Sequence, residues 1–203
     1  AALSLIDTRY LRSIPRSTLA SFLQLTLPIR KLLVSTKLAQ ARGLNTSYFA
    51  LNKKGARCEA CEGLGRIKLS MPLLPDTHII CSQCEGKRYH REALQIQWQG
   101  HSIAELEKLN VSSAMELFSH HKEIIQKLEF LKILGLEYLH LGQSFDTLSQ
   151  GELQRIKLAA ELSKPKHQHC LYIFDEPSMG LHLQEVSLLL YALRQLIEQG
   201  HSI

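Results

Sequence analysis

The sequence has no run of apolar residues long enough to cross a membrane, and its amino terminus does not follow the layout of a signal peptide. It also contains no internal repeats and no low-complexity tracts. These absences exclude a membrane-spanning protein and argue against secretion. We therefore expect a cytoplasmic protein that has no membrane partner and whose cysteines are reduced.

An initiator methionine is also missing, because the chain begins at Ala1. At the other end Gly200 closes a helix, and a strand is about to begin when the chain stops. We expect the 203 residues to be a piece of a longer protein. Hydrophobic residues make up 45% and charged residues 21%, which is typical of a globular chain with one large or two small domains. The net charge of +5 is compatible with a polyanionic partner.

The spacing of apolar residues predicts both helices and strands, so we expect a mixed α/β fold. A helix should open at Pro28 and end at Gly43. Short alternating runs, R-I-K-L-S-M at 66–71 and A-L-Q-I-Q-W at 93–98, predict hairpins. The other expected elements are a buried strand over 1–6, helical structure over 102–136, a buried parallel strand over 170–174 and a helix over about 183–199.

Two C-x-x-C pairs, separated by nineteen residues, are the clearest local motif. Such pairs can place four thiolates tetrahedrally around one Zn²⁺, and glycines after both pairs let the backbone curl around the metal. With four sulfur ligands the zinc would have no open position and would be structural. Two disulfides or four buried thiols are the alternatives. The proposed zinc ligands are Cys58, Cys61, Cys81 and Cys84, whereas Cys170 is expected to pack in a strand.

Basic residues surround the cysteine pairs, eight of them against four acidic residues. Tyr89 and Trp98 add flat surfaces that suit nucleotides or a partner protein. A small zinc hairpin with basic flanks is a reasonable contact for nucleic acid. A charged, solvated face is an equally good interpretation. The basic residues are Lys53, Lys54, Arg57, Arg66, Lys68, Lys87, Arg88 and Arg91.

Residues 147–157, T-L-S-Q-G-E-L-Q-R-I-K, begin a helix with more polar detail than a helix start requires. Ser149 is a good N-cap, and Glu152 three residues later completes a capping box. Gly151 lies in the first turn, where glycine costs about 1 kcal/mol relative to alanine. A helix N-terminus with free N–H groups and no side chain at Gly151 is a site for an anion such as phosphate.

The apolar run at 170–174 ends in Asp175 and Glu176. In open α/β sheets, ligands bind at the carboxyl ends of the strands. Asp175 is placed to hold Mg²⁺ through its water shell, and Glu176 to polarise a water for attack on a γ-phosphate.

In this order the motifs resemble an ABC-type ATPase: T-L-S-Q-G-E its signature loop, L-Y-I-F-D-E-P its Walker B strand and S-M-G-L-H its D-loop. The resemblance extends to P-R-S at 15–17, both cysteine pairs, and L-G-L-E-Y-L-H-L-G-Q-S before the signature. Over nearly the whole chain the sequence resembles the second ABC module of the UvrA family, the damage-sensing ATPases of bacterial nucleotide excision repair.

The resemblance implies a partial ABC-type (P-loop NTPase) nucleotide-binding domain with a helical signature domain and a small four-cysteine zinc hairpin. Residues 1–17 would form the Q-loop edge of the domain. Residues 18–146 would form the helical signature domain, with the zinc-binding insertion at about 52–92. Residues 147–203 would contain the signature loop, Walker B and the D-loop.

It also implies roles and partners. In this family the signature of one nucleotide-binding domain completes the ATP site of another, so Ser149, Gln150, Gly151 and Glu152 would close over ATP held by a second module. Asp175 would hold Mg²⁺ and Glu176 would be catalytic in the chain's own site. The implied partners are double-stranded DNA, a UvrB-like protein and a second copy in a homodimer. The expected DNA-phosphate contacts are Arg16, Lys87 and Arg88.

The chain departs from the family pattern at two positions: Thr8 replaces the Q-loop glutamine and Gln150 the first glycine of the signature. No G-x-x-x-x-G-K-[ST] occurs, so the phosphate-binding loop would lie before Ala1 and the fragment alone should not hydrolyse ATP. A catalytically degenerate module that binds DNA and regulates an active one is the main alternative. A zinc-dependent chaperone module of the Hsp40 kind is another, because C-E-A-C-E-G-L-G matches that family's knuckle.

Overall fold

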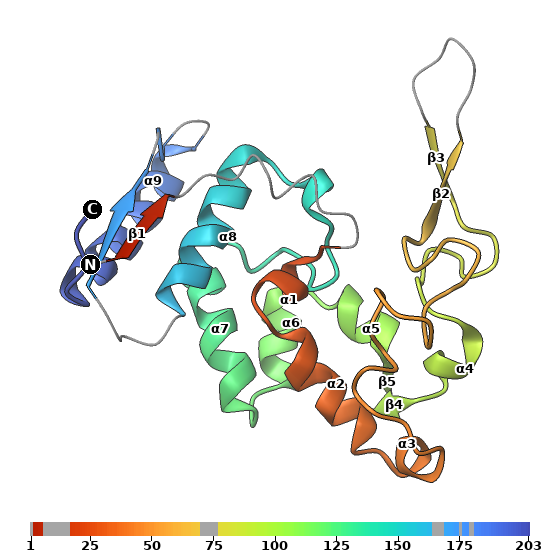
Figure 1. Ribbon diagram of the computed structural model, residues 1–203. Coiled ribbons are helices and arrows are strands. Elements are labelled where there is room, and N and C mark those ends of the chain that lie inside the picture. The colour runs from red at the N-terminus through yellow and green to blue at the C-terminus, as the bar shows by residue number, and fades with distance from the viewer. Residues whose placement is uncertain (1, 6–16, 70–76, 164–168, 175, 179–180) are drawn as a thin grey trace. The chain divides into compact units, whose positions relative to one another are not determined.

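The computed structural model describes residues 2–5, 17–69, 77–163, 169–174, 176–178 and 181–203 (Figure 1). The chain divides into two compact units. We call the first, Ala1–Leu25 with Leu109–Ile203, the helical unit. The second, Thr26–Lys108, is the cysteine unit.

The helical unit is organised by helices that pack in series: α7 on α6, α8 on α7, and α9 on α8. The rings of Phe22 and Phe145 meet edge to face beside these helices, with centroids 5.4 Å apart. No described helix is long and apolar enough to span a membrane. The elements are β1 (Ala2–Leu5), α1 (Leu19–Phe22), α6 (Val111–Leu117), α7 (Lys122–Ile133), η2 (Phe145–Thr147), α8 (Gln150–Leu162), β6 (Cys170–Ile173) and α9 (Leu183–Glu198).

β1 and β6 pair in parallel, with Leu5 opposite Ile173. The two strands were expected within 1–6 and 170–174, whereas their pairing with each other was not predicted. The burial of β6 differs from the prediction, because it alternates: Cys170 and Tyr172 are buried, whereas Leu171 and Ile173 are 40% and 45% exposed. The buried face points toward α8, since the Tyr172 hydroxyl donates a 3.3 Å hydrogen bond to Glu161. Within the described ranges the strand therefore has one covered face. The predicted helix over 183–199 is confirmed as α9.

Short elements make up the cysteine unit. β2 pairs antiparallel with β3, which confirms the hairpin expected at R-I-K-L, and β4 pairs antiparallel with β5. The elements are α2 (Thr26–Val34), α3 (Lys37–Ala41), β2 (Arg66–Leu69), β3 (Thr77–Ile80), α4 (Arg91–Leu94), β4 (Gln97–Trp98), β5 (His101–Ser102) and α5 (Ile103–Lys108).

The single helix predicted from Pro28 to Gly43 is wrong, because α2 and α3 are separate helices. Thr36 breaks the run. Its hydroxyl donates to the carbonyl oxygen of Leu33, and its oxygen accepts from the N–H of Ala39, so it caps the start of α3. Threonine side chains compete in this way with the backbone bonds of a continuous helix. The end at Gly43 is confirmed by a φ of 63° there.

The hairpin strand predicted over 93–98 is also largely wrong. Ala93 and Leu94 belong to α4, and only Gln97 and Trp98 are in a strand. His90 explains the difference, because its Nδ1 accepts a 3.3 Å hydrogen bond from the N–H of Ala93 and caps α4. Histidine is a weak predictor of a helix start, so the alternating apolar pattern was misleading here.

Candidate functional site

Four cysteine side chains come together in the cysteine unit. All four are buried, and their sulfur atoms lie within 4.8 Å of one another. The sulfurs of Cys58 and Cys81 are 3.9 Å apart, and those of Cys61 and Cys84 are 3.6 Å apart. A disulfide needs about 2.05 Å, whereas thiolates around one zinc at about 2.3 Å lie roughly 3.8 Å from each other. The four cysteines are free thiols at a spacing that could hold a metal ion.

The thiols differ in how readily they ionise. The N–H of Cys84, donated to the sulfur of Cys81, is the main cause that lowers the pKa of Cys81 to about 7. Burial raises the pKa of Cys84 to about 12 and also raises the pKa of Cys58. Cys81 therefore ionises more readily than Cys58 and Cys84. This donor set suits a soft divalent metal.

The two cysteine knuckles repeat one backbone conformation. After the first pair, Glu62, Gly63 and Gly65 have φ values of 49°, 78° and 75°. Glu85, Gly86 and Arg88 follow the second pair with 52°, 80° and 72°. A Cβ on Gly65 would lie 2.9 Å from the Gly86 carbonyl oxygen, so the glycine is needed where the knuckles meet.

Lys87 and Arg88, both predicted to contact DNA, differ in their surroundings. Lys87 lies near the surface and forms a 2.9 Å ion pair with Glu85. The guanidinium of Arg88 is engaged inside the unit: Nε donates to the carbonyl oxygen of Gly63 at 3.0 Å, and Nη1 lies 3.5 Å from Glu107 of α5. Glu107 also accepts a 2.7 Å hydrogen bond from the buried Tyr89 hydroxyl. Arg88 thus joins both knuckles to α5.

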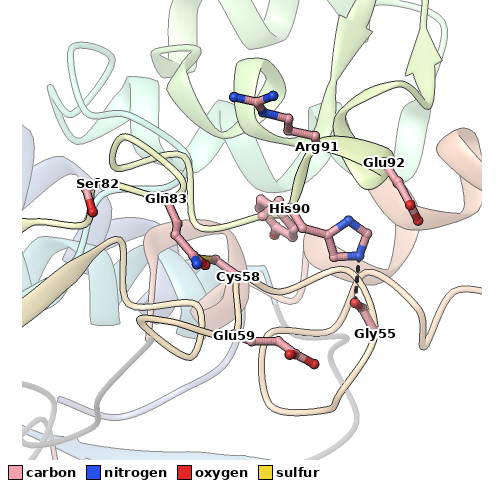
Figure 2. Close-up of a pocket in the computed structure, with 9 residues that line it drawn as sticks. Gly55, Cys58, Glu59, Ser82, Gln83, His90, Arg91 and Glu92 are labelled. Carbon is pink, nitrogen blue, oxygen red and sulfur yellow. Dashed lines mark hydrogen bonds between the residues drawn. The ribbon is translucent and has the colours of Figure 1, made fainter.

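A cavity of about 670 Å³ lies beside the cysteine cluster. Figure 2 shows His90 at its wall, with Nε2 bonded to the Gly55 carbonyl oxygen at 2.8 Å. Because Nδ1 accepts from the N–H of Ala93, both ring nitrogens of His90 are engaged in hydrogen bonds. The lining residues are Gly55, Cys58, Glu59, Ser82, Gln83, Tyr89, His90, Arg91 and Glu92.

In the helical unit, the predicted capping box at the start of α8 is confirmed. The Ser149 oxygen accepts from the Glu152 N–H at 3.2 Å, and Glu152 Oε2 accepts from the Ser149 N–H at 2.6 Å. Ser149 and Gln150 are exposed, whereas Gly151 is buried. The exposed start of α8 is therefore held in place by the side chains of Ser149 and Glu152.

Gly151 is covered by a residue that the sequence did not connect with it. A Cβ on Gly151 would lie 2.8 Å from Cδ2 of Leu181, which is closer than carbon atoms approach in folded proteins. Leu181 follows the Asp-Glu-Pro motif in the chain, and its N–H donates to the carbonyl oxygen of Ser178 in a turn. The glycine thus lets this turn approach the first turn of α8. Its role as an anion site remains a prediction.

Glu152 has a second partner, Tyr138, whose hydroxyl donates a 2.5 Å hydrogen bond to Oε1. Burial alone would raise the pKa of Glu152, but the hydrogen bonds from Tyr138 and Ser149 and the charge of Arg155 outweigh it and lower the pKa. Burial, followed by the hydrogen bond to Glu152, raises the pKa of Tyr138 to about 12. Both oxygens of Glu152 are therefore occupied.

Glu176 is the described member of the predicted catalytic pair, and Asp175 lies outside the described residues, as does Arg16. Glu176 follows β6, is exposed, and has a φ of 44°. Glu62 and Glu85 have similar φ values in the cysteine knuckles, so the catalytic role of Glu176 stays a prediction.

Arg155, in the middle of α8, is buried and joins three helices. Its Nη1 donates to the carbonyl oxygen of Leu134 after α7 at 3.1 Å, and its Nη2 lies 2.8 Å from Oε1 of Glu185 in the first turn of α9. Gly135 allows this convergence, because a Cβ there would lie 2.9 Å from Cδ1 of Leu188. These contacts connect the signature-like helix to the helix that follows the Asp-Glu-Pro motif.

No protein-family model matches the sequence. UvrABC system protein A from Haemophilus ducreyi is 45% identical over 198 residues, which cover 98% of this chain and 21% of that protein. The same protein from Aquifex aeolicus is 43% identical, with the same coverage. The crystal structure of UvrA2 from Deinococcus radiodurans superposes with a TM-score of 0.94 at 37% identity, over 100% of this chain and 25% of that one. The chain matches a fragment of UvrA. The predicted resemblance to the UvrA family is therefore confirmed, and the chain spans about a fifth of the length of these curated UvrA relatives.

Sequence reasoning missed the residues that fix α8: Tyr138, Arg155 and Glu185. One signal was present, because Arg155 lies among apolar residues of the helix and three positions after Glu152, on the same side. The partners at 138 and 185 had no local signal, since they come from other elements.

Proposed function

We propose that the chain is part of the second ABC-type ATPase module of a UvrA-like DNA-repair protein, an excinuclease subunit acting in the cytoplasm. The observation that carries this proposal is the contact between a capped, signature-like helix start and the turn after Asp-Glu-Pro, in a chain that matches UvrA over 98% of its length. In this assignment residues 1–17 are the Q-loop edge, 18–146 the helical signature domain with its insertion at about 52–92, and 147–203 the signature, Walker B and D-loop.

In the proposed nucleotide chemistry, the Asp-Glu pair after β6 and the start of α8 have different roles. Glu176 orients and polarises the attacking water in the chain's own site, while Asp175 holds Mg²⁺, which neutralises charge on the phosphates. Exposed Ser149 and Gln150, with Gly151 and Glu152, present the helix N-terminus to ATP bound by a second module. The sequence contains no phosphate-binding loop motif, so this chain by itself does not hydrolyse ATP.

The cysteine unit is proposed to hold one structural Zn²⁺ through Cys58, Cys61, Cys81 and Cys84 and to lie near double-stranded DNA. Of the proposed phosphate contacts Lys87 is the best placed, because the side chain of Arg88 already binds Gly63 and Glu107, and Arg16 is the third. Further exposed basic side chains on the unit support a DNA-facing role: Lys53, Lys54, Lys68 and Arg91. Homodimerisation and transfer of damaged sites to a UvrB-like protein complete the proposal.

The test is ATP turnover by the full-length protein that contains this chain, with the catalytic glutamate of its other module silenced. Glu176→Gln should lower the remaining turnover by about 10²-fold or more, because water activation and transition-state electrostatics depend on this carboxylate. Glu198→Gln, the same change on an exposed position of α9, serves as the control and should leave turnover unchanged.

A second candidate, a degenerate DNA-binding scaffold, is favoured by one observation. Gln150 places an exposed side chain at the first position of α8, where the family has glycine. If the protein with its other module silenced shows no turnover, and Glu176→Gln changes nothing, this second candidate replaces the first.

A further inference from the structure

The buried ion pair between Arg155 and Glu185 is a contact that the proposed chemistry does not use. Arg155 is 3% exposed, and the Glu185 side chain is 33% exposed. Burying an ion pair adds little net stability compared with well-packed apolar side chains, because desolvation offsets the attraction. A charged pair does fix orientation, since a planar guanidinium binds a carboxylate in a narrow range of directions.

Each member of the pair also holds a second group. Arg155 binds the Leu134 carbonyl oxygen at the end of α7, and Glu185 Oε2 accepts a 2.9 Å hydrogen bond from the N–H of His182, where α9 begins. Glu185 therefore binds the start of α9 with one oxygen and Arg155 with the other. As a result, α9 cannot shift along α8 without breaking a bond at a buried charge.

A second, independent contact joins α8 to the start of α9. Leu181 fills the space over Gly151 in the first turn of α8. Leu181 and Glu185 are four residues apart, and both contact α8, at Gly151 and Arg155. The segment that follows Glu176 is therefore attached to the signature-like helix at two points, one apolar and one charged.

We propose that Arg155 and Glu185 are positioning residues that keep residues 147–152 and residues 181–185 in one fixed arrangement. This inference rests on the proposed function. There, the signature acts on ATP held by another module, so the pair controls turnover at that opposite site and not at the site of Glu176. Loosening the pair leaves ATP binding by the opposite module intact, but it misaligns the helix N-terminus that completes the site.

The experiment uses the full-length protein in a Glu176→Gln background, so that the remaining turnover comes from the opposite site. Glu185→Gln is the informative change, because a glutamine oxygen still accepts from the His182 N–H while the ion pair is lost. We expect kcat to fall at least about fivefold and KM for ATP to change less than about twofold, since small displacements of positioning groups cost rate. Arg155→Lys, which keeps the charge but loses the planar fork, should give an intermediate loss.

Glu129→Gln, the same change at an exposed site of α7, is the matched control and should leave kcat unchanged. The active fraction of each variant is measured by ATP-analogue titration, so that partial unfolding is not read as slow turnover. An unchanged kcat per active site in Glu185→Gln overturns the inference and leaves the proposed function standing. If neither the wild-type protein nor the Glu176→Gln variant hydrolyses ATP, the proposed function is overturned, and the inference with it.

Discussion

The cysteine unit and the helical unit reach a stable structure by different routes. In the cysteine unit the longest described helix has 9 residues and two of the strands have 2 residues each. Four buried cysteines form a separate cluster there, in addition to a small apolar core that includes Leu33, Phe49, Ile96 and Leu106. The helical unit instead contains helices of 12, 13 and 16 residues with buried leucine and phenylalanine side chains. The cysteine unit thus combines a small apolar core with a four-cysteine cluster, whereas the helical unit relies on the packing of longer helices.

This difference shows where each unit can be perturbed. With the zinc site proposed above, we expect loss of one cysteine of the cluster to disturb the cysteine unit strongly, because metal binding and folding are coupled in small metal-binding domains. Loss of one apolar contact in the helical unit removes only a fraction of its stability. The proposed functions follow the same division. The cysteine unit is proposed to lie near DNA, and the helical unit holds the helix start and strand end proposed to act on nucleotide.

The largest effect is expected for Cys61→Ser. A structural zinc site contributes about 10–16 kcal/mol of apparent binding energy, so removing a ligand should abolish zinc binding and raise hydrogen exchange throughout 26–108. Zinc content and amide hydrogen exchange measure the two effects. Cys170→Ser, outside the cluster, is the control and should retain the zinc. Retention of zinc by Cys61→Ser would show that this cysteine is not a ligand.

A smaller and separable effect is expected for Phe145→Ala in the helical unit. Phe145 is 1% exposed and packs on Phe22, and truncating such a residue costs about 3–5 kcal/mol. Urea unfolding should show this loss while the zinc content remains that of the wild type. If zinc is lost as well, the stability of the cysteine unit depends on the helical unit, and the two units do not fold independently.

The smallest effect is expected for Tyr138→Phe, which removes the hydrogen bond to Glu152 and should cost at most about 1 kcal/mol because the tyrosine is half exposed. The pKa of Tyr138 is raised from 10.0 to about 12, so the stability from this bond is complete below pH 10 and lost as pH rises through about 12. The pKa of Glu152 is lowered from 4.5, so its contribution is present above pH 4.5 and lost as pH falls through the lower folded value.

Unfolding free energies of Tyr138→Phe and wild type, measured by urea titration, should therefore differ by a constant amount between pH 4.5 and 10. The difference should disappear toward pH 12. A difference that persists or grows toward pH 12 would contradict this prediction, because groups present in both proteins cancel in the comparison.

The features predictable from the sequence are those written in a few neighbouring residues. The C-x-x-C pairs bring their ligands together locally, and the capping box of Ser149 and Glu152 spans three positions. β6 and α9 were placed correctly because their apolar runs are unambiguous. Where local signals compete the prediction failed, as at Thr36, which divides α2 from α3.

Contacts between distant residues could not be predicted. Nothing near Gly151 points to Leu181, and nothing near Arg155 points to Glu185, because these pairs form only when α8 and α9 pack. Arg88 looked like one more surface base in a basic stretch, yet its side chain is directed inward by Glu107, nineteen positions later. The sequence indicates the residue types at the site, and the packing determines which of them remain available.

The repeated backbone of the two knuckles has a mechanical consequence. Where the first knuckle has Gly65, the second has Arg88 in the same left-handed conformation, at a cost of about 1–2 kcal/mol for a residue with a side chain. Because the second knuckle has a side chain at this position, Arg88 can link three parts of the unit. It belongs to the second knuckle, and its guanidinium binds both Glu107 of α5 and Gly63 of the first knuckle. We therefore expect a displacement of α5 to act on both cysteine knuckles at once, through the guanidinium of Arg88.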